Sequence, residues 1–536
     1  MPRRACYACR SSKVRCKLQG DEAGCQRCVT RQIHCSYMYK SQPSSRSDVI
    51  PSSPWTSSEQ SGFEPPPMRQ ANQDYRMEGG TLGLDVGKGR PEDLLREGEF
   101  THSLILLYFS NFSDIHFMFD EELFLADFST SQIPKVILYS IMALSIRFSM
   151  APFTEDLPPC HRGELLFKHA RSLLVEDFDW PSVPTIQAYL LLSTYKLAFG
   201  GSRQAYVYLG FAANMLRALR LLDISEGESS VSVETHRRLI CTMALMDRLI
   251  SFPLRLTPHF SRRDKIPPML HDDEFLALKR GRANQATRTH PNPQDVSVSQ
   301  EIMSLSEILA ELYEMFQDGQ DDVTQVLSRF IRHSSTRNGS LLWTPSNISN
   351  HLSHDTLRQF AYMHMLYHHI GQLVHFKALK PTFAQSQVQR ESAAECHGHA
   401  NSIAVIVETL WDEATFDLHN FSIGKILTTS VVVYAHALLE ASTTDAIQQL
   451  HDQITILTGC ISRIQNHTRM FIWVHQHLES FVNMFSRDKS VWAKVFDDNP
   501  HLLRQMLYLG SYYERFDPRT AGRRIGIEAL VESTLV

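Results

Sequence analysis

Apolar residues recur with helical periodicity from about residue 99 to the end of the sequence. Segments such as SLILLYFSNF (103–112), PKVILYSIMALSIRFS (134–149) and PTIQAYLLLSTYKLAF (184–199) have the spacing of buried or amphipathic helices, and strand-like alternation is scarce. Typical helix and loop lengths then predict roughly 15 to 20 helices. The pattern indicates a large all-α domain over residues 99–536.

Helix-breaking segments divide this region. They lie at Pro152–Pro159, Pro181–Pro184, Gly200–Gly201, Ser225–Ser232 and Arg280–Gln300. The longest apolar stretch, around Ile426–Leu439, is interrupted by hydroxyl residues and His436, so we expect a buried helix there rather than a membrane span. The first ten residues, MPRRACYACR, lack the apolar segment of a signal peptide. The sequence therefore predicts a soluble intracellular protein with no membrane partner.

The segment before the helical region has a different composition. Between Ser41 and Pro67, 15 of 27 residues are Ser or Pro, which predicts an extended, disordered tether within a linker over 41–98. The few apolar residues of this linker follow no heptad repeat. The absence of a coiled coil favours either a monomeric N-terminal head or dimerisation through the helical domain.

Charge is distributed unevenly along the chain. The formal net charge is −5, but residues 1–40 carry nine Lys and Arg against two acids, a sum of +7, which leaves −12 on the other 496 residues. This basic N-terminal segment, residues 1–40, is called the head. A basic head followed by an acidic remainder is the charge pattern expected of a protein that contacts nucleic acid only through its N-terminal segment.

Six of the ten cysteines lie in this basic head, with the pattern C-x2-C-x6-C written twice and separated by eight residues. They are Cys6, Cys9, Cys16, Cys25, Cys28 and Cys35. A two-residue gap lets both sulfurs of a pair bind one ion in a tight turn, and zinc prefers such thiolate ligands. Two tetrahedral zinc ions need eight ligand positions, so six thiolates suffice if two of them bridge both metals. The loaded head would keep a formal charge of about +5 and would still attract phosphate.

Two other interpretations of the cysteines remain open from spacing alone. Disulfides would suit an exported protein, and a single structural zinc would leave two thiols unused. The remaining cysteines, Cys160, Cys241, Cys396 and Cys460, are scattered and are most simply buried core thiols.

The segment ACYACRSSKVRC…GCQRCVTRQIHCSY resembles the fungal binuclear zinc-cluster (Zn2Cys6) transcription factors. The resemblance implies two short helix-loop units around two zinc ions, with Cys6 and Cys25 as the bridging ligands. It departs from the family in the loop KLQGDEAG, where glycines stand in place of a common proline. The resemblance also implies a nuclear regulator of RNA polymerase II genes.

The interval RSSKVR between Cys9 and Cys16 is long enough for about two helical turns that could enter a major groove. By resemblance, Lys13 occupies the position that reads guanines of a CGG-type triplet, and guanine offers two acceptors there. We expect Arg10, Arg15 and Lys17 to contact phosphates of the double-stranded DNA. Arg3 and Arg4 are candidates for the same task in a disordered arm.

The stretch from Pro184 to Ser251 resembles the fungal-specific transcription factor (middle homology) domain, and with the head the resemblance covers most of residues 1–270. The matching residues are Glu234, Arg237, Arg238, Asp247 and Arg248. We expect the first three to form structural ion pairs rather than ligand contacts. Ile240 and Cys241 replace common tryptophans, and FPLRLTP replaces a Gly-Arg-Pro turn. The domain is a candidate regulatory region for a small-molecule effector, although no pocket is identifiable from the sequence.

Catalytic motifs are weak. His364 and His368 have the i, i+4 spacing of metal ligands, but no third ligand is evident, and His475 and His477 would lie on different faces of a helix. No phosphate-binding loop or nucleophile elbow occurs in the sequence. The sequence therefore favours a non-enzymatic DNA-binding regulator. An enzyme or a protein-interaction adaptor carrying a zinc-cluster module is the alternative.

Overall fold

The computed structural model describes residues 98–479 with several gaps, together with Phe496. The gaps are 152–156, 176–177, 225–229, 262, 282–295, 319, 321, 381–385, 413–418, 473 and 477. Within these described residues the regular structure is entirely helical, made of α-helices and several short 3-10 turns. The predicted all-α character of this region is confirmed.

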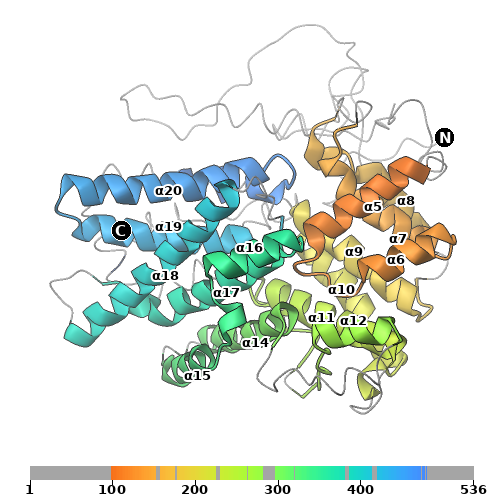
Figure 1. Ribbon diagram of the computed structural model, residues 1–536, viewed down its shortest axis with the longest axis horizontal. Coiled ribbons are helices and arrows are strands. Elements are labelled where there is room, and N and C mark those ends of the chain that lie inside the picture. Colours follow the sequence, from red (N-terminus) through yellow and green to blue (C-terminus); the bar gives the residue numbers. More distant parts are fainter. Residues whose placement is uncertain are drawn as a thin grey trace, which may run out of the picture. The chain divides into compact units, whose positions relative to one another are not determined.

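The first six helices lie together on the right-hand side of Figure 1. Their bounds are α5 Gly98–Phe112, α6 Glu121–Ser129, α7 Lys135–Ser145, α8 Glu164–Leu173, α9 Val183–Ala198 and α10 Ser202–Ala218. Helix α7 packs on α5, α8 and α9, and α9 pairs along its length with α10. The predicted breaks at Pro181–Pro184 and Gly200–Gly201 fall at the two ends of α9.

Four helices follow α10 in the chain. They are α11 Val231–Ser251, α12 Asp272–Lys279, α14 Val298–Gln317 and α15 Thr324–Ser335. Helix α11 contacts α10 on one side and α14 on the other, and α14 continues to α17. Through these contacts the N-terminal and C-terminal helices share one continuous apolar core.

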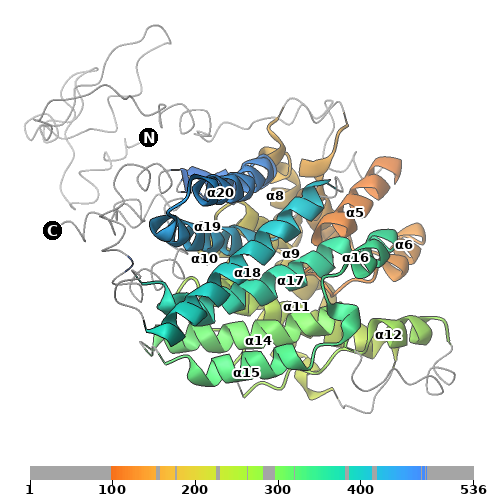
Figure 2. The same cartoon turned by 60° about the vertical axis from the view of Figure 1, so that its left-hand side comes forward.

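The C-terminal helices pack mainly on one another. They are α16 Pro345–Ser353, α17 Leu357–His375, α18 Gln387–Asp412, α19 Ile423–Glu440 and α20 Thr444–Ile464. Figure 2 shows α15, α14, α17 and α18 lying side by side, in agreement with their contacts. Helix α19 lies against α17, α18 and α20.

Local chemistry explains where several helices begin. Ser182 accepts a hydrogen bond from the Thr185 N–H, and Ser230 accepts one from the Val233 N–H, so both cap the first turn of their helices. Ser297 and Gln300 form a reciprocal capping box at α14. These side chains satisfy backbone donors that the helix itself leaves unpaired.

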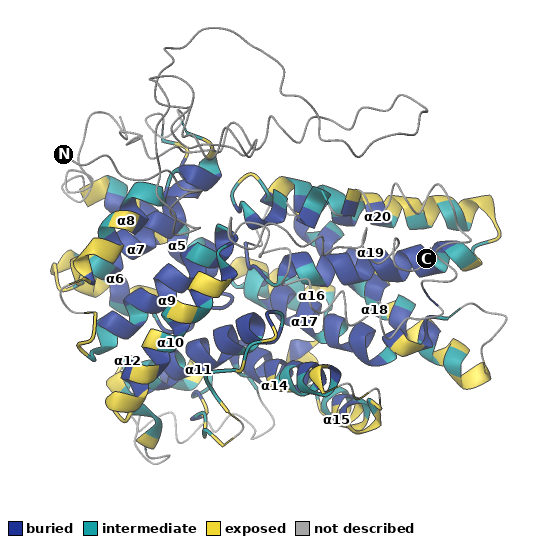
Figure 3. Ribbon diagram, turned by 180° about the vertical axis from the view of Figure 1, so that it is seen from behind, coloured by how far each residue is buried: buried dark blue, intermediate teal, exposed yellow. Residues whose placement is uncertain are grey.

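Burial follows the apolar pattern closely (Figure 3). Helix α19 is the one described helix long and apolar enough to cross a membrane, and 78% of it is buried inside the fold. The prediction of a buried helix around Ile426–Leu439 is therefore confirmed. The four cysteines outside the head, Cys160, Cys241, Cys396 and Cys460, are free and buried, as predicted.

Gly163 provides a test of how tightly α7 and α8 pack. It precedes α8, and a Cβ atom at this position would overlap the carbonyl oxygen of Ala143 in α7. We expect Gly163→Ala to destabilise the domain by about 1–3 kcal/mol, because backbone atoms must move to relieve the clash. Thermal unfolding followed by circular dichroism measures this loss.

Gly398 supplies the matched control. It lies exposed within α18, and a Cβ there meets no atom within 4 Å. Gly398→Ala should therefore stabilise the protein by about 0.5–1 kcal/mol through helix propensity. If both substitutions shifted the melting temperature in the same direction, the tight approach of α7 and α8 would be refuted.

Candidate functional site

The predicted head lies outside the described residues, which begin at residue 98. This applies to the six cysteines of residues 6–35, to Lys13 and to the arginines and Lys17 around it. Their roles as zinc ligands and DNA contacts stay predictions, as do the tether over 41–67 and the domain boundaries. His477 is also outside the described residues.

The polar residues singled out on α11 form a buried network. Glu234 is fully buried, and its Oε1 accepts hydrogen bonds from Arg238 Nε and from the Leu270 N–H, both at 3.0 Å. Arg237 lies 3.6 Å from the other oxygen of Glu234. Arg238 also donates to Asp272 at 2.8 Å. The predicted ion pairs are thus present, and they fix α11 to the start of α12.

Asp247 and Arg248 anchor the other end of α11. Asp247 accepts hydrogen bonds from the Ser251 hydroxyl at 2.7 Å and from the Phe260 N–H at 2.8 Å. Arg248 donates to Ser306 on α14 at 2.7 Å. In the segment FPLRLTP that follows α11, Arg255 lies in the left-handed region with φ 54°. These contacts hold the segment after α11 against the core.

The histidine pair on α17 is part of an aromatic cluster. The ring of His364 lies edge-on to Phe360 and Trp343, with centroid distances of 4.7 and 5.1 Å. Nδ1 of His368 lies 2.9 Å from Nδ1 of His399 on α18. Burial lowers the pKa of His364 to about 3, so this imidazole is neutral at physiological pH. Across the part of the chain that the structure describes, no group of three or more His, Cys, Asp or Glu is placed to hold a metal ion.

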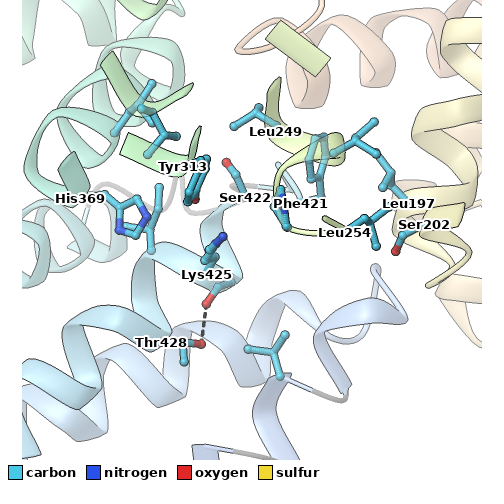
Figure 4. Close-up of a pocket in the computed structure, with 17 residues that line it drawn as sticks. Leu197, Ser202, Leu249, Leu254, Tyr313, His369, Phe421, Ser422, Lys425 and Thr428 are labelled. Atoms are coloured by element: carbon cyan, nitrogen blue, oxygen red, sulfur yellow. Dashed lines mark hydrogen bonds between the residues drawn. The ribbon is translucent and has the colours of Figure 1, made fainter. Parts of the chain in front are cut away.

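A cavity of about 50 Å³ lies where α11, α14, α17 and α19 meet. Figure 4 shows Leu249, Leu254 and Phe421 to the right of His369, with the hydroxyl residues Ser202 and Ser422 near them. Residues from both halves of the domain therefore contribute to one site.

Lys425 is the cation of this cavity. It lies in the first turn of α19, and its Nζ is 4.3 Å from the centre of the Tyr313 ring on α14. Burial lowers the pKa of its ammonium to about 7, because the charged form loses hydration. The facing aromatic ring favours the cation. Lys425 is therefore poised between its charged and neutral forms near neutral pH.

His369 lies beside Lys425 (Figure 4). It is 1% exposed. Burial, assisted by the charge of Lys425, lowers the pKa of His369 to about 3, and a side-chain hydrogen bond with Gln372 opposes that change. The neutral ring therefore presents one N–H donor and one acceptor.

No spacing in the sequence identified this cavity. The i, i+4 spacing on this helix drew attention to His364 and His368, whereas the neighbouring His369 is the one that lines the cavity. One signal was present, since Lys425 is the only charged residue among the nineteen residues 421–439. Its partners in the cavity come from distant segments, so spacing alone could not have revealed them.

Comparison with known proteins identifies both parts of the chain. Residues 4–44 match the fungal Zn(2)-Cys(6) binuclear cluster domain, and residues 105–355 match the fungal specific transcription factor domain. The second match continues past residue 270, beyond the part of the chain that the sequence resemblance covered.

Several curated proteins share this similarity. A transcriptional regulatory protein of Schizosaccharomyces pombe is 24% identical over 290 residues, which cover 47% of this chain and 30% of that protein. The Zn(2)-C6 fungal-type transcription factors FTF1a and FTF1c of Fusarium oxysporum f. sp. lycopersici are each 23% identical over 331 residues. Those matches cover 49% of this chain and 30% and 35% of the two relatives. The chain thus spans about a third of the length of the curated relatives that it matches.

Proteins that combine a six-cysteine cluster domain with a helical domain of this kind form the class of zinc-cluster proteins. The chain is similar to that class in both parts, through the fungal Zn(2)-Cys(6) binuclear cluster domain at residues 4–44 and the fungal specific transcription factor domain at residues 105–355. The cluster domain implies zinc as the metal, and the family matches indicate a regulator rather than an enzyme.

The buried network on α11 leads to a stability prediction. Glu234→Ala should lower the free energy of unfolding by about 3–5 kcal/mol, because Arg237 and Arg238 would lose a buried counter-charge. The matched control is Asp223→Ala, which removes an exposed partner of Arg220 and should cost less than about 1 kcal/mol. Equal losses in a thermal or denaturant melt would contradict the structural role of Glu234.

Proposed function

We propose that the chain is a nuclear, sequence-specific DNA-binding regulator of transcription by RNA polymerase II. The observation that carries the proposal is the doubled C-x2-C-x6-C unit in a strongly basic head, supported by the cluster-domain match over residues 4–44. The printed names of the relatives, which are transcription factors and a transcriptional regulatory protein, support the same function.

The donor set of the head fits zinc. Six thiolates are the ligands that structural zinc prefers, and two ions would be shared among Cys6, Cys9, Cys16, Cys25, Cys28 and Cys35. In this proposal Cys6 and Cys25 bridge the two ions. Bound zinc supplies the folding free energy that so short a segment cannot obtain from an apolar core.

Recognition of DNA follows from the basic interval between Cys9 and Cys16. Lys13 reads guanines of a CGG-type triplet in the major groove. Arg10, Arg15 and Lys17, with Arg3 and Arg4 in the N-terminal arm, neutralise phosphates and set affinity without specifying sequence.

The other parts of the chain have supporting roles in this proposal. Residues 1–40 bind DNA, residues 41–98 act as a tether, and residues 99–536 form the regulatory domain. The regulatory domain receives a small-molecule effector, and it provides the surface for any homodimer. The extensive apolar core of the helical unit supports its role as an independently folded regulator.

Zinc content is the first test. Native mass spectrometry of the full chain should find two zinc ions, and Cys16→Ser should lower that number. Cys160→Ala is the matched control, because this thiol lies buried in the helical domain and should leave both ions bound. A wild-type chain with fewer than two zinc ions would refute the binuclear head.

Base discrimination is the second test. Lys13→Ala should lose about 1–3 kcal/mol of preference for a CGG-type site over a scrambled site at a fixed salt concentration. Arg15→Ala should instead weaken binding to both DNAs by similar factors, since phosphate contacts carry no sequence information. Fluorescence anisotropy with the zinc-loaded full chain measures both. If Lys13→Ala weakened both DNAs equally, its assignment to base recognition would be wrong.

A further inference from the structure

We propose that the cavity where α11, α14, α17 and α19 meet binds a small uncharged ketone whose oxygen accepts a hydrogen bond from Ser202. The alkyl groups of the ligand pack against Leu249, Leu254 and Phe421, which lie near Ser202 in Figure 4. This inference deepens the proposed function, because it names the site and the chemical class of the effector. The regulatory consequence of binding rests on that proposed function.

The hydroxyl group of Ser202 is the observation that points to a ligand. Ser202 is the first residue of α10, lines the cavity and is 3% exposed. Its Oγ has no hydrogen-bond partner among the described residues. A buried hydroxyl group without a partner costs free energy, and such groups normally find one in folded proteins. A ligand oxygen in the cavity would accept the Ser202 proton and remove that cost.

The start of α10 gives a separate reason to expect an acceptor. The residue before this helix is Gly201, which has no side chain to cap the first turn. Over the 17 residues of α10 the aligned peptide dipoles place partial positive charge at the N-terminus. An oxygen with partial negative charge beside Ser202 therefore meets a hydrogen-bond donor and a favourable field together.

The other hydroxyl groups that line the cavity already have partners. Thr428 donates to the carbonyl oxygen of Gly424 at 2.7 Å, and Ser422 donates to the side-chain oxygen of Asn420 at 3.0 Å. Neither of these groups needs a ligand to complete its hydrogen bonding. The polar contact of the ligand is therefore assigned to Ser202.

The remaining wall favours an uncharged ligand. Aliphatic and aromatic side chains form most of it. The basic side chains among its described residues are engaged within the protein, because Lys425 lies over the ring of Tyr313 and His369 has a side-chain hydrogen bond with Gln372. An anion would lose its hydration on entering this wall without meeting an unengaged cation. An uncharged molecule avoids that loss.

A ketone fits a single hydroxyl donor better than an alcohol does. Two hydroxyl groups that face each other can satisfy only one of their two protons, so an alcohol would leave one proton in need of another acceptor. A ketone brings an acceptor and no proton of its own. Pairing it with Ser202 leaves no donor of either partner unsatisfied.

The volume limits the size of the ligand. About 50 Å³ holds about four water-sized groups, which corresponds to a molecule of about four to six non-hydrogen atoms. Butan-2-one lies in this range. Its hydrocarbon isostere, 2-methylbut-1-ene, has the same shape with a methylene group in place of the oxygen. Propionate has the same number of non-hydrogen atoms and carries a negative charge.

The position of the cavity connects binding to regulation. Ser202 belongs to α10, Leu249 belongs to α11, and Phe421 precedes α19. A ligand that contacts all three stabilises the arrangement in which these segments meet around it, and so shifts the population of the domain towards that arrangement. Phe421 lies beyond the 105–355 match, so the family comparison covers only part of this site.

Saturation-transfer NMR of the full chain with butan-2-one, 2-methylbut-1-ene and propionate tests the proposal. The deciding quantity is the ratio of ketone affinity to alkene affinity, because the contacts of the alkyl groups cancel in it. We expect butan-2-one to bind, and propionate to bind at least about fivefold more weakly than the ketone, since the carboxylate loses its hydration in the cavity.

Two variants complete the experiment. Ser202→Ala removes the hydroxyl group and keeps the apolar wall, so the ratio of ketone to alkene affinity should fall at least about fivefold. Ser145→Ala is the matched control and should leave the ratio unchanged, because this buried hydroxyl on α7 lies outside the cavity and already donates to the Ile141 carbonyl at 2.9 Å. Should Ser202→Ala fail to fold, the comparison of ketone with propionate on the unaltered chain decides the matter.

The outcomes separate this inference from the proposed function. Absence of ketone binding, an unchanged ratio in Ser202→Ala, or propionate binding as tightly as butan-2-one would overturn the ketone site. Binding is measured without DNA, and DNA recognition is measured separately. A chain that binds CGG-type DNA but no ketone would leave the proposed function standing while this inference fails. A chain that binds butan-2-one through Ser202 but no DNA would do the reverse.

Discussion

The fold of the helical domain depends on helices that are apolar around most of their circumference. Helices α9, α17 and α19 bury residues on nearly every face, so each must be surrounded by other helices rather than laid on a surface. Helices α11 and α14 meet this requirement by packing between the N-terminal and C-terminal groups. The continuous core, the buried ion pairs and the cavity all follow from that constraint.

Charged groups inside such a core lose their hydration, and two polar sites of the domain show how the fold accommodates them. At the start of α11, Glu234 has partners in Arg237, Arg238 and the Leu270 N–H, which is the arrangement expected of a structural network. At the cavity, burial disfavours the charged forms of His369 and Lys425. The first site joins α11 to α12, whereas the second brings titratable side chains of α14, α17 and α19 around one cavity.

Much of the helical fold was predictable because its signals are local. Proline and glycine pairs marked both ends of α9, and apolar periodicity identified α5, α7 and α19. The ion pairs of Glu234 were predictable too, because partners three and four residues apart lie on one face of a helix. The cavity was not predictable from the sequence. Its residues Tyr313, His369 and Lys425 lie far apart in the chain, and no spacing relates them to one another.

The sequence by itself determined the chemistry of the head and the class of the body. Six cysteines within thirty residues predict a metal site through spacing alone, because neighbouring ligands on a short chain segment are close in any compact conformation. Helical periodicity likewise records which face of each segment avoids water. Only the tertiary structure decided which helices would meet and which polar side chains would be enclosed between them. Contacts of that kind depend on the packing of many helices at once, and no local pattern in the sequence encodes them.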